Sequence, residues 1–570
     1  MLTRVVVIAF IAVSVVAGAC AAPGSPRTAD PAASGQPAVK KRLTAGMFSD
    51  PAGLHLEMTN PGGSTGSAPG LGELYQLVHA GMGYYDDAEV LQPHLAQRIP
   101  SAENGDWTIY PDGRMETAWT LRNGITWHDG TPLTAADFVF TVQVNQDREI
   151  GIVNPSALAL VESVEAQDPR TVVVRWKSPF IEADQIFIPG LALPLPKHIL
   201  EKSLDEDKGH FLNLPYWRDG FVGAGAYRIQ EWTAGTHVIL AANDAYLLGR
   251  PKIDEIEVKF ITDLNALIAN LLAGSIEKPI GRGLRVEHIL QIRDMTGEIK
   301  VAVGDTLGGV LPLYPQFVGT YPLIIRNADF RRALMYAIDR KEMDDTINFG
   351  LGGVADSWLQ HDRPEYPAVS NRIVRYPFDP QRATEMIQGL GYSRGGDGVL
   401  RDASGEKLSL QVRTTEQNTI QARAIFPLVG YWKRIGIEAE SLIVPNQQIP
   451  DREYRSQFPG FELVSSGHSV RSSSIRQYHS ASTPLQSTRF QGSNRARYQV
   501  PDFDALIDRY VVTIPMPERM AILGDILHHQ TDQLTMFPLF FQGEGSVLGA
   551  ARLRNVTGGK MWNAHLWDIA

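Results

Sequence analysis

Strand-like and helix-like patterns alternate along most of this chain, and this alternation restricts its possible folds more than any other feature. The β-branched run 171–176 and the alternating segment 253–261 are typical of strands, whereas the apolar spacing in 330–338 and 421–435 predicts helices. No internal repeat accompanies the alternation. We therefore expect an α/β fold with more than one sheet.

The remaining elements follow from the same two periodicities. Thr134 comes after a tight turn and is expected to cap a helix that begins at Ala135. Further strands are predicted over 42–48, 114–127, 223–232, 237–241, 407–414, 438–444 and 536–541, and further helices over 71–82, 263–273, 380–390 and 516–531.

Composition excludes several classes of protein. Hydrophobic residues make up 44% of the 570 positions, which is enough for a large core and excludes a disordered or fibrous chain. The formal net charge of −10 argues against a nucleic-acid partner, which normally requires a basic face. Cys20 is the one cysteine, so an intramolecular disulfide and a zinc–thiolate site are both excluded.

The N-terminus has the pattern of an export signal. Arg4 precedes the apolar run 5–16, which is too short to span a bilayer, and small residues lead to Cys20. The segment resembles a bacterial lipobox, in which the cysteine is acylated and becomes the mature N-terminus. This resemblance predicts a lipoprotein signal peptide at 1–20, a flexible tether at 21–41 and a body held outside the cytoplasm at a membrane. An ordinary signal peptide with an incidental cysteine is the alternative.

Possible catalytic motifs receive no support from their context. Ser64 and Ser393 each lie in a Gly-x-Ser-x-Gly pattern, but a nucleophile elbow needs a strand before the serine and a helix after it. Ser64 lies in a Gly/Ser/Pro-rich loop, and Ser393 follows a predicted helix. His528 and His529 are adjacent on a predicted helix, so their side chains diverge. We expect no enzyme activity, cofactor or metal, with an exported hydrolase as the alternative.

A longer motif identifies a family. The segment 121–140, LRNGITWHDGTPLTAADFVF, resembles the signature of the family 5 extracellular solute-binding proteins, the receptors of oligopeptide-, dipeptide- and nickel-type ABC importers. The segments 223–229, 330–340 and 376–391 resemble further family motifs and follow in the family's order. The resemblance implies a periplasmic-binding-protein-like type II fold, with two lobes joined by crossing strands and an additional small domain.

The family's architecture translates into expected boundaries. Lobe I is expected to comprise 42–60, 223–300 and 501–570, with the additional domain at 61–222 and lobe II at 301–500. The resemblance implies a monomeric receptor that traps a solute between its lobes and delivers it to permease subunits in the membrane. A surface lipoprotein that uses the fold without an importer is a further alternative.

The predicted solute site differs from that of peptide-binding members. In those proteins a lobe II segment resembling FDLALLGWGADY supplies a tryptophan that packs on the ligand and an aspartate that pairs with its α-ammonium. Counted without gaps from Phe461, His468 takes the place of the tryptophan and Arg471 that of the aspartate. Arginine repels an ammonium, so an anionic compound or an oligosaccharide is expected rather than an ordinary peptide, with an oligopeptide as the alternative.

Other residues are expected to complete this site. Ser466 belongs to the same lobe II segment, and Trp358 and His361 follow the helix 330–338 and its extension. His55, Glu57 and Asn60 lie in the loop after the first strand, where family members touch ligand. The alternative for Arg471 is that it pairs with an acid of its own lobe and braces the cleft.

Overall fold

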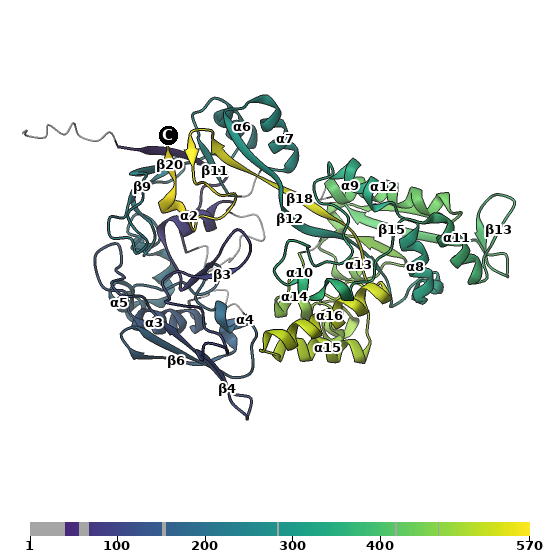
Figure 1. Ribbon diagram of the computed structural model, residues 1–570, viewed down its shortest axis with the longest axis horizontal. Coiled ribbons are helices and arrows are strands. Elements are labelled where there is room, and N and C mark those ends of the chain that lie inside the picture. Colours follow the sequence, from purple (N-terminus) through teal and green to yellow (C-terminus); the bar gives the residue numbers. More distant parts are fainter. Residues whose placement is uncertain (1–39, 56–67, 151–155, 282–283, 417–418, 466) are drawn as a thin grey trace, which may run out of the picture. The chain divides into compact units, whose positions relative to one another are not determined.

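The computed structural model describes residues 40–55, 68–150, 156–281, 284–416, 419–465 and 467–570 (Figure 1). The predicted signal peptide, most of the tether and four of the expected site residues lie outside these ranges: Cys20, Glu57, Asn60 and Ser466. No helix in the described ranges combines the length and hydropathy of a membrane span.

The first sheet has five strands in the order β11-β1-β10-β9-β8. Its strands are β1 (Arg42–Met47), β8 (Tyr227–Thr233), β9 (His237–Ala242), β10 (Glu255–Phe260) and β11 (Lys278–Ile280). β1 pairs in parallel with β10 and β11, and β9 pairs antiparallel with β8 and β10. Leu43, Ala45 and Met47 alternate along β1 and are all buried, which explains why this short segment forms a strand. This sheet is the centre of lobe I.

Three helices accompany the first sheet. α2 (Leu71–Val78) packs near β8, and its leucines belong to the same buried cluster as the sheet. α6 (Leu264–Leu272) and α7 (Val286–Met295) share a smaller apolar cluster with the crossing strands described below.

A separate antiparallel sheet forms the additional domain, in the order β4-β5-β7-β6. It contains β4 (Trp107–Ile109), β5 (Met115–Thr120), β6 (Val161–Asp168) and β7 (Thr171–Trp176). The helix α3 (Ala135–Gln146) packs on β6 and β7. The backbone N–H of Thr134 donates to Oδ2 of Asp137 at 2.8 Å, so the predicted start of this helix is confirmed.

The second large sheet, in lobe II, has the order β16-β15-β17-β12-β18. Its strands are β12 (Ile299–Pro315), β15 (Ser409–Thr415), β16 (Glu438–Val444), β17 (Phe461–Leu463) and β18 (Phe537–Ala550). β12 and β18 pair antiparallel along most of their length, and several irregularities interrupt their register. One end of the pair contacts β11 and α7, and the other end joins β17, so the pair connects the two sheets (Figure 1).

Helices of lobe II cover both faces of its sheet. Phe461 and Leu463 lie in an apolar core with α8 (Ala328–Tyr336), α9 (Arg340–Ile347), α11 (Pro380–Gly389) and α12 (Thr419–Arg434). Glu462 lies between them in sequence and therefore points to the opposite face. The remaining elements of lobe II include α10 (Tyr366–Val369), α13 (Arg452–Ser456), α14 (Ser472–Arg476), α15 (Pro501–Val512) and α16 (Met516–Gln533).

Short elements complete the chain. They are β2 (Gly83–Tyr85), β3 (Leu91–Pro93), α4 (Ser156–Ala159), α5 (Lys197–Glu206), β13 (Ser393–Arg394), β14 (Leu400–Arg401), β19 (Leu553–Arg554) and β20 (Asp568–Ile569). Ser393 thus lies in a two-residue strand after α11, which is not the strand–serine–helix order of a nucleophile elbow.

Two expected domain boundaries need correction. Residues 501–533 were assigned to lobe I, but α15 packs on α14, and α16 packs on α8 and α10, all in lobe II. These helices pack against lobe II elements and share a buried apolar cluster with residues of the additional domain such as Ile181, and the chain returns to lobe I through β18. The start of the additional domain also differs, because α2 contributes its leucines to the lobe I core.

Candidate functional site

The segments that follow the parallel strands carry most of the residues expected to bind a solute. His55 follows β1, and His468 and Arg471 follow β17. Loops at the carboxyl ends of parallel strands are the usual place for ligand sites in α/β folds.

Arg471 is exposed and lies at the boundary between lobe II and the additional domain. It is the residue before α14, and the centre of its guanidinium is 6.0 Å from the ring centroid of Tyr85 in β2. Within the described ranges its guanidinium forms no ion pair shorter than 4.0 Å, so the structure gives no support to a brace with an acid of its own lobe. The nearby acid that interacts with its charge is Glu182, in the additional domain.

Glu182 connects the additional domain to lobe II directly. Its carboxylate accepts hydrogen bonds from the backbone N–H of Ser472 and, at 3.0 Å, from the Ser472 hydroxyl. Burial raises the pKa of Glu182, although these bonds and the charge of Arg471 oppose the shift. Nη1 of Arg519 also donates to the carbonyl of Ile181 at 3.4 Å. The turn around residue 182 is therefore held against α14 and α16.

Asp184 lies beside this contact and is partly buried, with its Oδ1 shielded from solvent. Burial raises its pKa to about 7, and the positive charge of Arg519 only partly offsets that shift. Its Oδ1 accepts no hydrogen bond from the described residues. Asp184 is therefore a carboxyl group whose charge state changes near neutral pH.

His468 and Trp358, both expected to line the site, lie in a buried aromatic cluster. Nδ1 of His468 is 2.5 Å from the hydroxyl of Tyr478, and Nε2 is 3.3 Å from the hydroxyl of Tyr314. Trp358 Nε1 donates to Oε1 of Gln530 at 2.7 Å. Burial lowers the pKa of His468 to about 3, which keeps the imidazole neutral. In this arrangement both side chains support the segment that carries Arg471, and direct contact with a solute stays a prediction.

His55 and His361 lie apart from that cluster. The His55 ring lies edge-on to Trp217 with centroids 6.3 Å apart, and burial together with Arg218 lowers its pKa. His361 is exposed and lies edge-on to Phe541 of the crossing strand β18, with centroids 5.8 Å apart. His55 thus follows the end of β1 and His361 contacts the crossing pair, and contact of either with a solute stays a prediction.

A groove between α7 and α12 was not expected from the sequence. It encloses about 450 Å³, a volume within the range of small-molecule sites. Nη2 of Arg423 and Oε1 of Glu287 form an ion pair across it at 2.8 Å. The exposed ring of Phe426 lies on its apolar side, and its lining is completed by Arg285, His288, Glu416, Ala422 and Ile443. The charged residues at the start of each helix were the only sequence signal.

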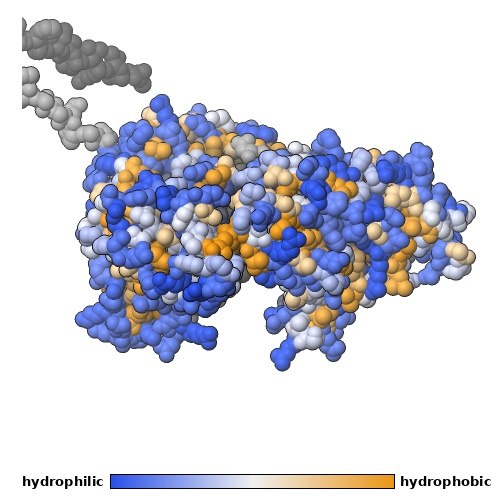
Figure 2. Space-filling view, turned by 60° about the horizontal axis from the view of Figure 1, so that its bottom comes forward, coloured by the Kyte–Doolittle hydropathy of each residue, from blue (hydrophilic) through white to orange (hydrophobic). Residues whose placement is uncertain are grey.

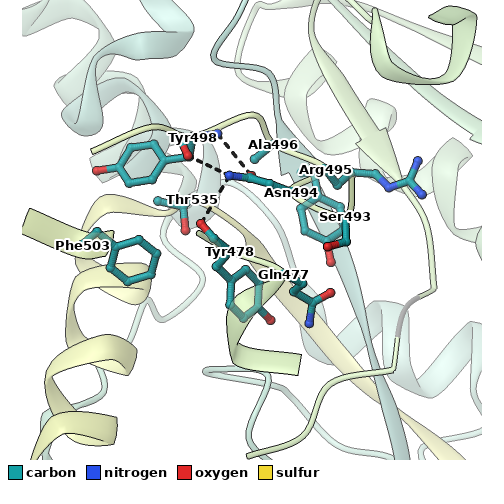
Figure 3. Close-up of a pocket in the computed structure, with 10 residues that line it drawn as sticks. Gln477, Tyr478, Ser493, Asn494, Arg495, Ala496, Tyr498, Phe503 and Thr535 are labelled. Atoms are coloured by element: carbon teal, nitrogen blue, oxygen red, sulfur yellow. Dashed lines mark hydrogen bonds between the residues drawn. The ribbon is translucent and has the colours of Figure 1, made fainter. Parts of the chain in front are cut away.

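A second cavity, beside Asn494, is too small for a solute. Its volume of about 10 Å³ accommodates one water molecule. The Asn494 side-chain amide donates to the carbonyls of Tyr498 and Tyr478, at 2.8 and 3.3 Å, and so ties the surrounding loops together (Figure 3). Arg495 points away from this cavity in the same view.

The described residues contain no group of three or more His, Cys, Asp or Glu side chains suited to hold a metal ion. In the space-filling view, hydrophobic residues form several separate patches on a largely hydrophilic face (Figure 2). Neither observation adds a further site for chemistry on that face.

The chain matches a family model and several curated proteins. Residues 91–478 match the model of the bacterial extracellular solute-binding proteins, family 5 (middle region). The chain is similar to the oligopeptide-binding protein AppA of Bacillus subtilis, with 27% identity over 348 residues that cover 58% of this chain and 59% of that protein. The matched stretches span about half to three fifths of the curated relatives' length.

Solved structures share the fold. The ABC transporter substrate-binding protein CtaP of Listeria monocytogenes has a TM-score of 0.72 and 20% identity, covering 93% of this chain and 99% of that one. NikZ of Campylobacter jejuni, solved with Ni(L-His), has a TM-score of 0.64 and 19% identity, covering 93% and 100%. At these identities the likeness establishes the two-lobe α/β fold and leaves the solute open.

Proposed function

Because this chain belongs to the bacterial extracellular solute-binding proteins of family 5, we propose that it is the substrate-binding receptor subunit of an ABC importer. In this role it captures a small solute between its lobes and delivers it to a membrane permease. The observation that carries the proposal is the crossing pair β12 and β18, which connects two separately built sheets. Such a pair lets the lobes move about a hinge, and a solute that contacts both lobes stabilises the closed form.

We propose that the solute carries a carboxylate or phosphate group, or is an oligosaccharide. Arg471 supports this, because its guanidinium is exposed, has no ion pair among the described residues and lies at the edge of the additional domain. A guanidinium binds carboxylates and phosphates through paired hydrogen bonds and repels an ammonium. An oligopeptide remains the second candidate, since the curated relative AppA is named for oligopeptide binding.

The location and partners follow from the family and the N-terminal pattern. The proposal places the body outside the cytoplasm, anchored by a lipid on Cys20, as a monomer that engages permease subunits. The family match and the named relatives are of solute-binding proteins, which supports binding without catalysis.

Calorimetric titration with modified peptides and organic acids tests the solute class. We expect that blocking the amino group of a bound peptide changes affinity less than about threefold, whereas amidating its carboxylate weakens binding about tenfold or more. Arg471→Gln should remove this difference, and Arg476→Gln, on the same helix, should retain it. Tight binding of ordinary peptides that is lost on blocking their amino terminus contradicts the proposed solute class.

A further inference from the structure

An arginine cluster in lobe II carries more positive charge than its acidic partner neutralises. Glu462, in β17, is fully buried and is the shared partner of Arg413, Arg455 and Arg495. Nη2 of Arg413 is 3.1 Å and Nε of Arg455 is 3.8 Å from Oε1 of Glu462, and Nη1 of Arg495 is 2.8 Å from Oε2. No other carboxylate of the described residues pairs with these three arginines within 4.0 Å, which leaves two positive charges in excess.

The three arginines are not equally satisfied. Arg413 is 3% exposed, donates to the backbone carbonyls of Tyr454 and Arg455, and stacks on the ring of Phe458 at 4.7 Å. Arg413 is therefore a structural residue. The other two side chains are partly exposed, Arg455 at 19% and Arg495 at 30%, so part of each side chain is in contact with solvent.

Arg455 shows the clearest lack of hydrogen-bond partners among the three arginines. Its Nε is buried and has no hydrogen-bond partner among the described residues. Burial lowers its pKa, and the charges of Arg495 and Arg413 lower it further. A buried donor on a charged group costs free energy when it is left unpaired, and adjacent like charges add to that cost. An anion bound at the exposed parts of Arg455 and Arg495 offsets the second of these costs.

We propose that Arg455 and Arg495 form a binding site for an oxyanion group, on the side of lobe II that Glu462 faces. Guanidinium groups bind the oxygens of phosphate, sulfate and carboxylate through paired N–H donors, whereas chloride accepts no such pair. The site is built from α13 and the loop before α15. A free inorganic anion and an organic acid are two sources of the same chemistry.

The test uses the whole protein with sodium phosphate and sodium acetate as probes, each against sodium chloride at equal ionic strength. Calorimetric titration should show saturable binding of at least one oxyanion to the natural chain, and Arg455→Gln and Arg495→Gln should each weaken it at least tenfold. Arg326→Gln removes an exposed positive charge from the same lobe and should bind as the natural chain does. Circular dichroism checks that each variant is folded.

The probes also distinguish the source of the anion. Binding of phosphate alone assigns the site to phosphate-like anions, and binding of acetate alone assigns it to organic acids. Absence of binding of both probes to the natural chain at 10 mM (about the weakest affinity useful for such a site) overturns the proposal without reference to any variant. Equal affinity in Arg455→Gln, Arg495→Gln and the natural chain also overturns it. Loss of anion binding in Arg471→Gln, with binding unchanged in Arg455→Gln and Arg495→Gln, would place the anion at the proposed solute site and overturn this proposal.

Discussion

Glu182 and Ser472 are 290 positions apart in the sequence, and yet both the backbone N–H and the hydroxyl of Ser472 donate to the Glu182 carboxylate. This contact joins the additional domain to the first turn of α14, next to Arg471. The Glu182–Ser472 contact forms only while the additional domain and lobe II touch. It therefore stabilises the arrangement in which a solute is enclosed.

Substituting Glu182 by Gln should therefore weaken solute binding. Hydrogen bonds to a charged acceptor contribute about 1.5–3 kcal/mol, so we expect at least a tenfold loss of affinity in calorimetric titration. Glu165→Gln, in the additional domain and paired with Arg175, is the matched control and should have little effect. Unchanged affinity in Glu182→Gln would show that the contact does not contribute to solute capture.

The raised pKa of Asp184 predicts that the stability of the protein falls as the pH rises. Its pKa is about 7 in the folded protein, above the ordinary value of 3.8, so the folded state binds its proton more tightly than the unfolded state. The stabilisation from this proton is complete below about pH 4 and is lost as the pH rises through 7. Glu182 and Arg519 are the charged groups that face it.

Asp184→Asn is expected to remove this contribution. Urea unfolding at pH 5 and pH 8 should show a smaller loss of stability with rising pH in the variant, by on the order of 2–4 kcal/mol. The buried histidine His468, with a pKa of about 3, works in the opposite direction on acidification but is present in both proteins. Identical pH profiles for the two proteins would contradict the burial of an ionisable Asp184.

His468→Ala separates a packing role from a solute-binding role. Removing the ring leaves the hydroxyl of Tyr478 without its partner and opens a cavity against Trp358, so the free energy of unfolding should fall by about 2–4 kcal/mol. Urea unfolding measures this loss. Unaltered stability together with a hundredfold loss of solute affinity would instead assign His468 to direct solute contact.

The groove between α7 and α12 gives a further prediction. Phe426 is 57% exposed, so Phe426→Ala should change the free energy of unfolding by less than about 0.5 kcal/mol. If the groove belongs to the solute site, affinity should fall about fivefold or more, since an apolar contact of ring size is lost. Phe378→Ala, another exposed phenylalanine of lobe II, is the matched control. Equal affinities in both variants would exclude the groove from the site.

The sequence predicted short, locally determined elements well. The strands 171–176 and 438–444 have the expected bounds, and the Thr134 cap is confirmed by its bond to Asp137. The long strand Ile299–Pro315 was not predicted, because its pattern is interrupted by glycines and its register with β18 shifts several times. Such a strand is stabilised by pairing with its partner strand, and its own sequence pattern does not indicate it.

The site residues could likewise be predicted only where the local sequence determines their position. Arg471 was predicted through a family motif, and its contact with a solute stays a prediction. The burial of His468 was not foreseen, because it results from Tyr314 and Tyr478, which lie in other segments of the chain. The sequence also did not predict the groove, because its two sides, 285–288 and 416–426, meet only in the folded protein.

The shared strand pair has a consequence for how the protein is made. β12 is synthesised long before β18, and until β18 is made one edge of β12 has no partner. Neither half can therefore reach its final state by itself, and the unfinished chain is open to mispairing with other chains. Protection of that lone edge until the last strand has been made becomes a requirement of the architecture itself.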